Sequence, residues 1–332
     1  MNVPTWVWLA TIGGLIALLA VDLLLVDHKP HAVSITEATR WVVFYVLCAV
    51  VFGLGIWYFA GDDFAVQYFA GYITEYSLSV DNLFIFVIIM SRFRVPIIHQ
   101  HRVLLVGIAL ALVMRGLFIA AGAVLISRFS WVFYLFGMLL IYLGWQQIRH
   151  KDKHENEGYR ENIALRALRK LVPVTNEYHG SKLTIKQQGK RWITPMVVVM
   201  LAIGTTDLIF ALDSIPAIFG LTKEPYLVFA ANVFALMGLR QLYFLIGGLL
   251  DKIMYLSIGL GAILGFIGVK LILEALHDNR LPFLNGGQPL SAVPTVGIEL
   301  SLSVIVGVLL VTTVASLLKV RRNLAAARSL IE

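Results

Sequence analysis

Long apolar stretches separated by short polar ones run along the whole chain. Nine of them are close to 20 residues long, enough for a helix to cross a hydrocarbon core of roughly 30 Å. They predict spans at residues 5–26, 41–60, 66–91, 103–126, 130–149, 193–219, 226–247, 253–276 and 297–318. The apolar runs are continuous and do not alternate with a period of two, which favours helices over a β-barrel. The predicted fold class is an all-α polytopic membrane protein with about nine transmembrane helices.

Composition agrees with this class. The 332 residues are 59% hydrophobic, too apolar for a soluble domain with one anchor. No Lys or Arg precedes the first apolar segment and no small-residue cleavage site follows it, so we expect an uncleaved span and not a signal peptide. The single cysteine, Cys48, offers neither a disulfide nor a thiolate metal clip.

Loop charges predict the orientation. With the N-terminus outside and the C-terminus inside, 21 of the 27 basic residues fall in inside segments and three in outside segments. This asymmetry follows the positive-inside rule. The net charge of +7 is therefore explained by topology, and we expect no nucleic-acid partner. Membrane lipids are the expected surroundings, in a bacterial inner membrane.

Two of the predicted spans carry a matching pair of acids. Glu75 and Asp81 are separated by five residues in the third span, and Asp207 and Asp213 are separated by five residues in the sixth. Ionisable groups within membrane-spanning helices are expensive to insert, by several kcal/mol each on insertion scales, and usually mark function. The repeated acidic pair is therefore the first candidate for a site.

The two acidic spans have opposite predicted directions, which indicates an inverted repeat of three plus three helices, a common plan of secondary transporters. Arg115 and Arg240 each follow one span after an acidic pair and support this hypothesis. The predicted organisation is an N-terminal helix and inner loop at 1–40, a first repeat at 41–126, the start of a second repeat at 127–149, a basic cytoplasmic loop at 150–192, the rest of the second repeat at 193–247, and two C-terminal helices with a basic tail at 248–332.

Helix geometry limits how the acids can act together. Six residues of regular helix rotate about 600° and rise about 9 Å, so Glu75 and Asp81 point some 120° apart. Either the helices are broken at these points or one site draws acids from both helices. Gly71, Gly204 and Pro216 favour some breakage, and Pro216 would free a backbone carbonyl beside Asp213.

The donor chemistry indicates a hard divalent cation. Carboxylate, hydroxyl and amide oxygens suit manganese, magnesium or calcium, whereas the eight histidines all fall in loops or at span ends. The candidate metal ligands are Glu75, Asp81, Asn82, Asp207, Asp213 and Ser214. Arg115 and Arg240 are candidates for charge compensation or gating. The alternative is that these arginines permanently neutralise two acids and hold helices together. Lys270 and Glu274, at i and i+4, are expected to form a local ion pair.

The long polar segment 150–191 is expected to be a cytoplasmic linker with one short surface helix near 162–171. Neither this segment nor the rest of the chain contains a G-x-x-x-x-G-K-[ST] phosphate-binding loop, so the sequence shows no motif for ATP hydrolysis.

These motifs resemble the TerC family, an integral membrane family placed in the LysE superfamily, and in particular its Alx-like members. The resemblance rests on Glu75 to Asn82, Thr205 to Pro216 and Asn232 to Arg240, and covers residues 41–318. It implies export of Mn²⁺, with Glu75, Asp81, Asp207 and Asp213 as ligands. Some relatives carry a further soluble regulatory domain, and its absence after residue 332 puts nucleotide-type regulation in doubt.

The expected function is thus export of manganese from the cytoplasm, coupled to protons, with Mn²⁺ as transported ion and no prosthetic group. Three rivals stay open: an accessory protein for tellurite resistance or redox balance, a passive divalent cation channel, and an intramembrane aspartyl protease. The Gly-x-Gly-Asp signature of such proteases is absent, so we do not expect an enzyme.

Overall fold

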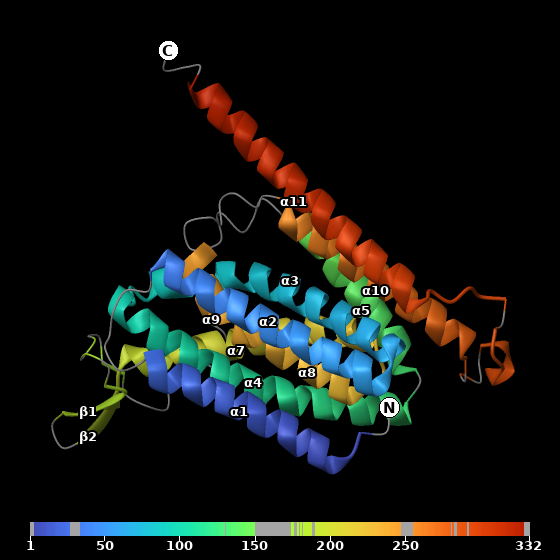
Figure 1. Cartoon of the computed structure of the whole chain (residues 1–332), viewed down its shortest axis with the longest axis horizontal. Coiled ribbons are helices and arrows are strands. Elements are labelled where there is room, and N and C mark those ends of the chain that lie inside the picture. The colour runs from blue at the N-terminus through green and yellow to red at the C-terminus, as the bar shows by residue number, and fades with distance from the viewer. Residues whose placement is uncertain are drawn as a thin grey trace.

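The computed structural model describes residues 3–26, 34–129, 131–149, 174–175, 178, 180, 182–187, 190–246, 255–279, 281, 284–290 and 292–328. Its helices are α1 (Thr5–Val26), α2 (Ile35–Ala60), α3 (Asp62–Arg92), α4 (Ile97–Arg128), α5 (Val132–Arg149), α7 (Pro195–Phe219), α8 (Pro225–Met237), α9 (Leu239–Ile246), α10 (Leu256–His277) and α11 (Ile298–Arg328), with a 3₁₀ turn, η2, at Asn285–Gly287. Figure 1 shows them as a helical bundle from which the C-terminal part of α11 projects.

The predicted class is confirmed, because the described part of each of the nine predicted segments is mainly helical and the chain is an all-α polytopic membrane protein. Within the described residues, seven helical segments are long and apolar enough to cross a bilayer: α2, α3, α4, α7, Pro225–Leu245, α10 and α11. The helices α1 and α5 are apolar as well. Nine crossings and the orientation of the chain stay predictions.

Local sequence explains several helix ends. The Ser34 side chain accepts a hydrogen bond from the Glu37 backbone N–H at 3.2 Å and caps α2. Proline stands at the first position of α7 and of α8, where a backbone N–H would have no partner within the helix, so its absence costs no hydrogen bond. Gly61, at φ 103°, turns the chain directly from α2 into α3, a conformation that favours glycine.

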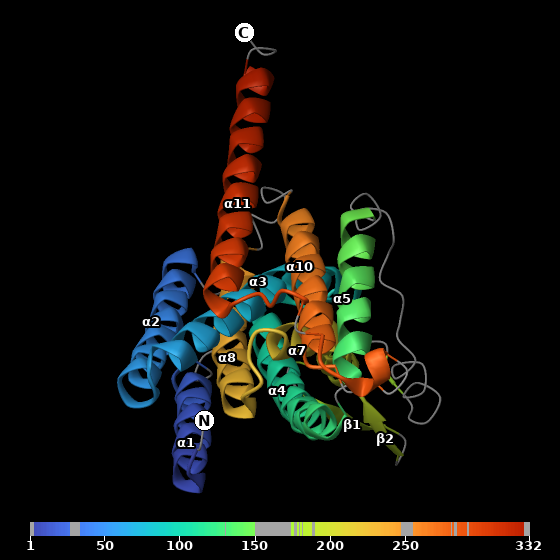
Figure 2. The same ribbon diagram turned by 90° about the vertical axis from the view of Figure 1, so that its right-hand side faces the viewer.

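The core is built from α3, α4, α7 and α8. Along these helices α4 packs against α7 and α3 packs against α8, while α3 and α7 also touch each other. Helices of the first predicted repeat therefore pack against helices of the second, although the repeat and its boundaries stay predictions. Turning the molecule by 90° shows α5 and α10 side by side at one side of this core (Figure 2).

Two expectations about the backbone are wrong. The helix α3 runs unbroken through Glu75 and Asp81, and α7 stays helical past Pro216, which lies in its last turn. Gly204 instead allows close packing, because a Cβ there would lie 2.6 Å from Cδ2 of Leu110. The interruption falls at Gly238, between α8 and α9.

The predicted short helix near 162–171 lies outside the described residues. The described end of the polar segment instead forms a two-stranded antiparallel hairpin, β1 (Thr184–Gln187) and β2 (Lys190–Ile193), which we did not predict. The sequence does carry a signal for it, because two short strand-like runs flank a two-residue link that ends in Gly189.

Glycines hold α5 against α10. A Cβ on Gly144 would lie 2.5 Å from the carbonyl oxygen of Gly261, and one on Gly268 would lie 2.7 Å from the carbonyl oxygen of Gly137. These neighbours are backbone atoms, which cannot rotate away. Small residues allow this approach, as in other membrane helix pairs.

Gly144→Ala is therefore expected to destabilise the protein by about 1–3 kcal/mol, the usual penalty of overpacking. The measurement is the thermal midpoint of the purified protein in detergent. Gly265→Ala, on the partner helix, is the matched control, because a Cβ there meets nothing within 4 Å. Equal midpoints for the two variants would contradict this account of the interface.

Candidate functional site

One arginine joins the first acids of both predicted pairs. The Nε of Arg115 donates to Asp207 Oδ2 at 2.7 Å and its Nη2 donates to Asp207 Oδ1 at 3.1 Å, a two-pronged pair. Its Nη1 donates to Glu75 Oε1 and, at 3.1 Å, to the hydroxyl of Ser214. The site therefore unites α3, α4 and α7 at one point.

Helix periodicity explains why these atoms meet. Ser214 follows Asp207 by seven residues, close to two full turns, so both lie on one face of α7. Asp213 is about 120° away from Asp207 on the same helix and lies half-buried, within electrostatic reach of Glu75 and Arg115. The structure thus brings the Glu75 and Asp207 carboxylates together and leaves Asp213 at their side.

The centre of the site is closed to solvent. Glu75, Asp207 and Arg115 are each at most 1% exposed, and Ser214 is 0% exposed. Burying an ion pair is favourable only when its geometry and hydrogen bonds are good, and removing one partner leaves a buried charge uncompensated. Two carboxylates facing one guanidinium carry a net charge of −1 when all three groups are ionised.

Two oxygens in this region have bonding capacity to spare. Glu75 Oε2 and the hydroxyl of Ser79 are buried and make no hydrogen bond with any described residue. Ser79 follows Glu75 by one helical turn, so both lie on the same face of α3. Buried oxygens without a hydrogen-bond partner are rare in native proteins and usually indicate a water, an ion or a ligand.

Asp81 belongs to a different polar cluster. Its carboxylate accepts a hydrogen bond from Gln147 Nε2 of α5 at 2.8 Å and another from the Ser257 hydroxyl of α10 at 2.9 Å. It is half-buried, about 9 Å along α3 from Glu75 by helical rise. Gln147 and Ser257 were missed in the sequence, although a glutamine within an apolar span was an available signal.

The remaining candidates are Asn82 and Arg240. Asn82 is half-buried beside Asp81 on α3. Arg240 is 3% exposed on α9, and with the Gln241 amide turned so that its oxygen faces the guanidinium, that oxygen accepts from Arg240 Nε at 3.2 Å and Nη2 at 2.7 Å. Buried Asn232 of α8 has both amide atoms without a partner among the described residues.

The acids do not form a ready-made metal cage. Over the described ranges, no group of three or more His, Cys, Asp or Glu side chains is placed to hold an ion. The physical reason is visible in the contacts: Arg115 fills the space between Glu75 and Asp207, and Asp81 faces Gln147 and Ser257. What the arrangement can do is exchange one cationic partner for another.

A many-spanning helical membrane protein with a buried acid–arginine–acid centre is the class that fold and site define. The chain belongs to the integral membrane protein TerC family, whose model matches residues 60–324.

Its relatives come from several bacteria. The chain is similar to an uncharacterized membrane protein of Mycobacterium tuberculosis strain H37Rv, with 48% identity over 95% of this chain and 80% of the relative. An uncharacterized membrane protein of Myxococcus xanthus is 39% identical over 95% of this chain and 92% of its own length. Alx of Escherichia coli strain K12, described as a candidate membrane-bound redox modulator, is 33% identical over 89% of each chain. No solved structure matches the chain.

Proposed function

We propose that this protein exports divalent manganese from the cytoplasm across a bacterial inner membrane, by proton-coupled secondary transport. The observation that carries the proposal is the buried centre in which Arg115 bridges Glu75 and Asp207. In this arrangement the guanidinium stands where a transported cation would stand. The donors are carboxylate and hydroxyl oxygens, which suit Mn²⁺.

Competition between arginine and metal gives a transport cycle. When Mn²⁺ reaches Glu75 and Asp207, Arg115 turns away from them, and Glu75 Oε2, Ser79 and Asp213 supply further oxygens. When the ion leaves, Arg115 returns and the carboxylates are again compensated. A carboxylate that loses its cationic partner in a dry site gains affinity for a proton, so protons can take the place of the metal on the return path.

Asp81 extends the route on one side of the centre. In the predicted orientation it lies toward the cytoplasm, where Gln147 and Ser257 hold its carboxylate in place. An ion entering from the inside would meet Asp81 first and the Arg115 centre second. The two acidic positions of α3 then act in sequence along one path, in agreement with their separation on a regular helix.

Proteoliposome flux separates this function from its nearest alternative. With the purified protein in vesicles, an imposed pH gradient is expected to drive Mn²⁺ against its own gradient. A passive channel would only let Mn²⁺ equilibrate, whatever the pH gradient, and that result would overturn proton coupling.

The description of the Escherichia coli relative favours one other candidate, modulation of membrane redox balance. This role would act through partners, because the chain has one cysteine, Cys48, and no cofactor-binding motif. Absence of divalent-ion binding by the purified protein, together with a changed redox state of the membrane in a deletion strain, would favour it over export.

A further inference from the structure

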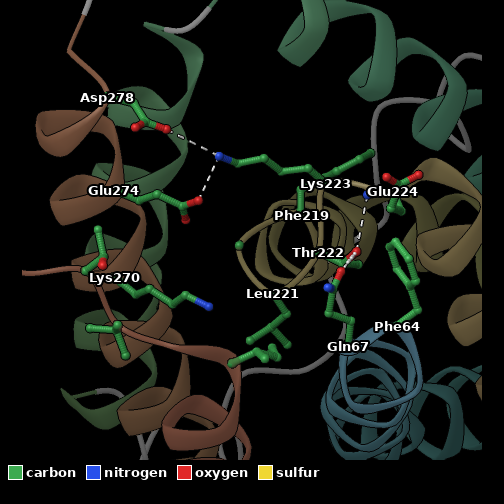
Figure 3. A pocket seen from close by; sticks show the side chains of 14 residues that line it. Phe64, Gln67, Phe219, Leu221, Thr222, Lys223, Glu224, Lys270, Glu274 and Asp278 are labelled. Atoms are coloured by element: carbon green, nitrogen blue, oxygen red, sulfur yellow. Dashed lines mark hydrogen bonds and ion pairs between the residues drawn. The ribbon is translucent and has the colours of Figure 1, made fainter. Parts of the chain in front are cut away.

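A second polar site lies where α3 and α8 begin and α7 and α10 end. A cavity of about 490 Å³ opens between the start of α3, the loop joining α7 to α8, the end of α10 and the segment before α11. Figure 3 shows its side chains, among them Gln67, Thr222, Lys223, Lys270 and Glu274. Its volume is within the range of small-molecule sites. By helical rise, Gln67 is about 12 Å from Glu75, so the cavity is separate from the Arg115 centre.

Lys270 supplies an unsatisfied cation. Its side chain is 94% buried, since it is 6% exposed, and points from α10 into the cavity (Figure 3). The expected ion pair between Lys270 and Glu274 is wrong: Glu274 Oε1 is 2.7 Å from Lys223 Nζ instead. In the described part of the chain, Lys270 Nζ makes no hydrogen bond and no ion pair within 4 Å, and Glu274 acts on it only through longer-range electrostatics.

Of the three acids that line the cavity, the two on α10, Glu274 and Asp278, are engaged by a lysine, and the third is Glu224. Lys223, on the loop after α7, reaches across to Glu274 and also lies 3.7 Å from Asp278 Oδ2. Figure 3 shows these two contacts spanning the cavity above Lys270. The ammonium of Lys270 is therefore left facing a space whose nearest carboxylates on α10 hold another lysine.

A second free donor faces the cavity from α3. The Gln67 Oε1 atom accepts a hydrogen bond from the Thr222 hydroxyl at 2.6 Å, and that hydroxyl in turn accepts from the Glu224 backbone N–H at 3.2 Å. These bonds fix the Gln67 amide so that its Nε2, which has no partner in the described residues, remains available. Lys270 and Gln67 thus present N–H donors to the cavity, while the one acceptor they carry, Gln67 Oε1, is already bonded to Thr222.

We propose that this cavity binds an oxyanion of the phosphate type, held by Lys270 Nζ and Gln67 Nε2. An ammonium and an amide N–H are donors without matching acceptors, and a charge-assisted bond to an anion is the strongest way to satisfy them. The ligand is a free phosphate or the phosphate of a lipid headgroup, which share this chemistry. The site is independent of the proposed manganese export.

The test is titration of the purified full-length protein in detergent by calorimetry. One arm uses inorganic phosphate and the other a short-chain phosphatidylglycerol, each at constant ionic strength set with chloride. We expect saturable binding in at least one arm, and the arm that binds identifies the source. Lys270→Met is expected to weaken that binding at least tenfold.

Two further variants keep the proposal falsifiable. Gln67→Glu places a carboxylate opposite Lys270 and is expected to abolish binding by supplying an internal partner. Lys182→Met removes an exposed lysine outside the cavity and should leave binding unchanged. No saturable binding in either arm, or equal binding by wild type and Lys270→Met, would overturn the proposal. Manganese transport is not part of any readout, so failure here leaves the export proposal untouched.

Discussion

Arg115→Gln is expected to be the most destabilising single change at the centre of the molecule. It removes the cation shared by Glu75 and Asp207, both at most 1% exposed, and leaves two carboxylates buried without compensation. Breaking a buried pair in this way typically costs about 3–5 kcal/mol. Thermal unfolding of the purified protein in detergent measures the loss.

The triple variant Glu75→Gln, Arg115→Gln, Asp207→Asn tests whether the loss comes from charge. It keeps the shapes of the two acid side chains, shortens residue 115 and removes all three charges, so we expect the triple variant to be clearly more stable than Arg115→Gln and to show no export. If the arginine only locks helices together, this stable variant would still protect cells from manganese. Unchanged instability of the triple variant would contradict the electrostatic explanation.

Asp213→Ala and Asp81→Ala are expected to abolish relief of manganese toxicity in a strain that lacks its own manganese exporters. Both carboxylates are half-buried and lie outside the Arg115 bridge, so their loss leaves no buried charge unpaired. We therefore expect expression and stability near wild type together with at least a hundredfold loss of Mn²⁺ flux. The measurement is growth in manganese, with membrane protein levels determined in parallel.

Asp63→Ala is the matched control for this pair. Asp63 lies exposed in the first turn of α3, on the same helix as Asp81, and should tolerate the change. Full rescue by Asp81→Ala or Asp213→Ala at normal expression would remove that residue from the site. Loss of rescue by Asp63→Ala would point to an effect on insertion.

The membrane helices could be predicted because length and apolar content alone decide what spans a bilayer. The paired acids were equally visible, because a carboxylate stands out in an apolar segment. The argument from helical rotation also correctly separated Glu75 from Asp81, which the structure places in different clusters. Their roles as metal ligands stay predictions.

Long-range partners could not be predicted in the same way. Nothing in the sequence around Gln147 or Ser257 indicates that both reach Asp81, because this depends on how α5 and α10 pack. The ion pair of Glu274 with Lys223 was not predicted, because Lys270 lies four residues from Glu274 on the same helix and was the nearer candidate in the sequence. Gly204 was misinterpreted in the sequence: it suggested a broken helix, whereas the structure shows that it makes space for the side chain of Leu110.

The central claim is that the carboxylates bridged by Arg115 bind the transported cation. Its most direct test is calorimetric titration of Mn²⁺ into the purified full-length protein and into the triple variant Glu75→Gln, Arg115→Gln, Asp207→Asn, which removes the three buried charges. We predict saturable binding of one Mn²⁺ per chain to the wild type and no binding to the folded triple variant. Equal binding by both proteins, or none by the wild type, would contradict the claim.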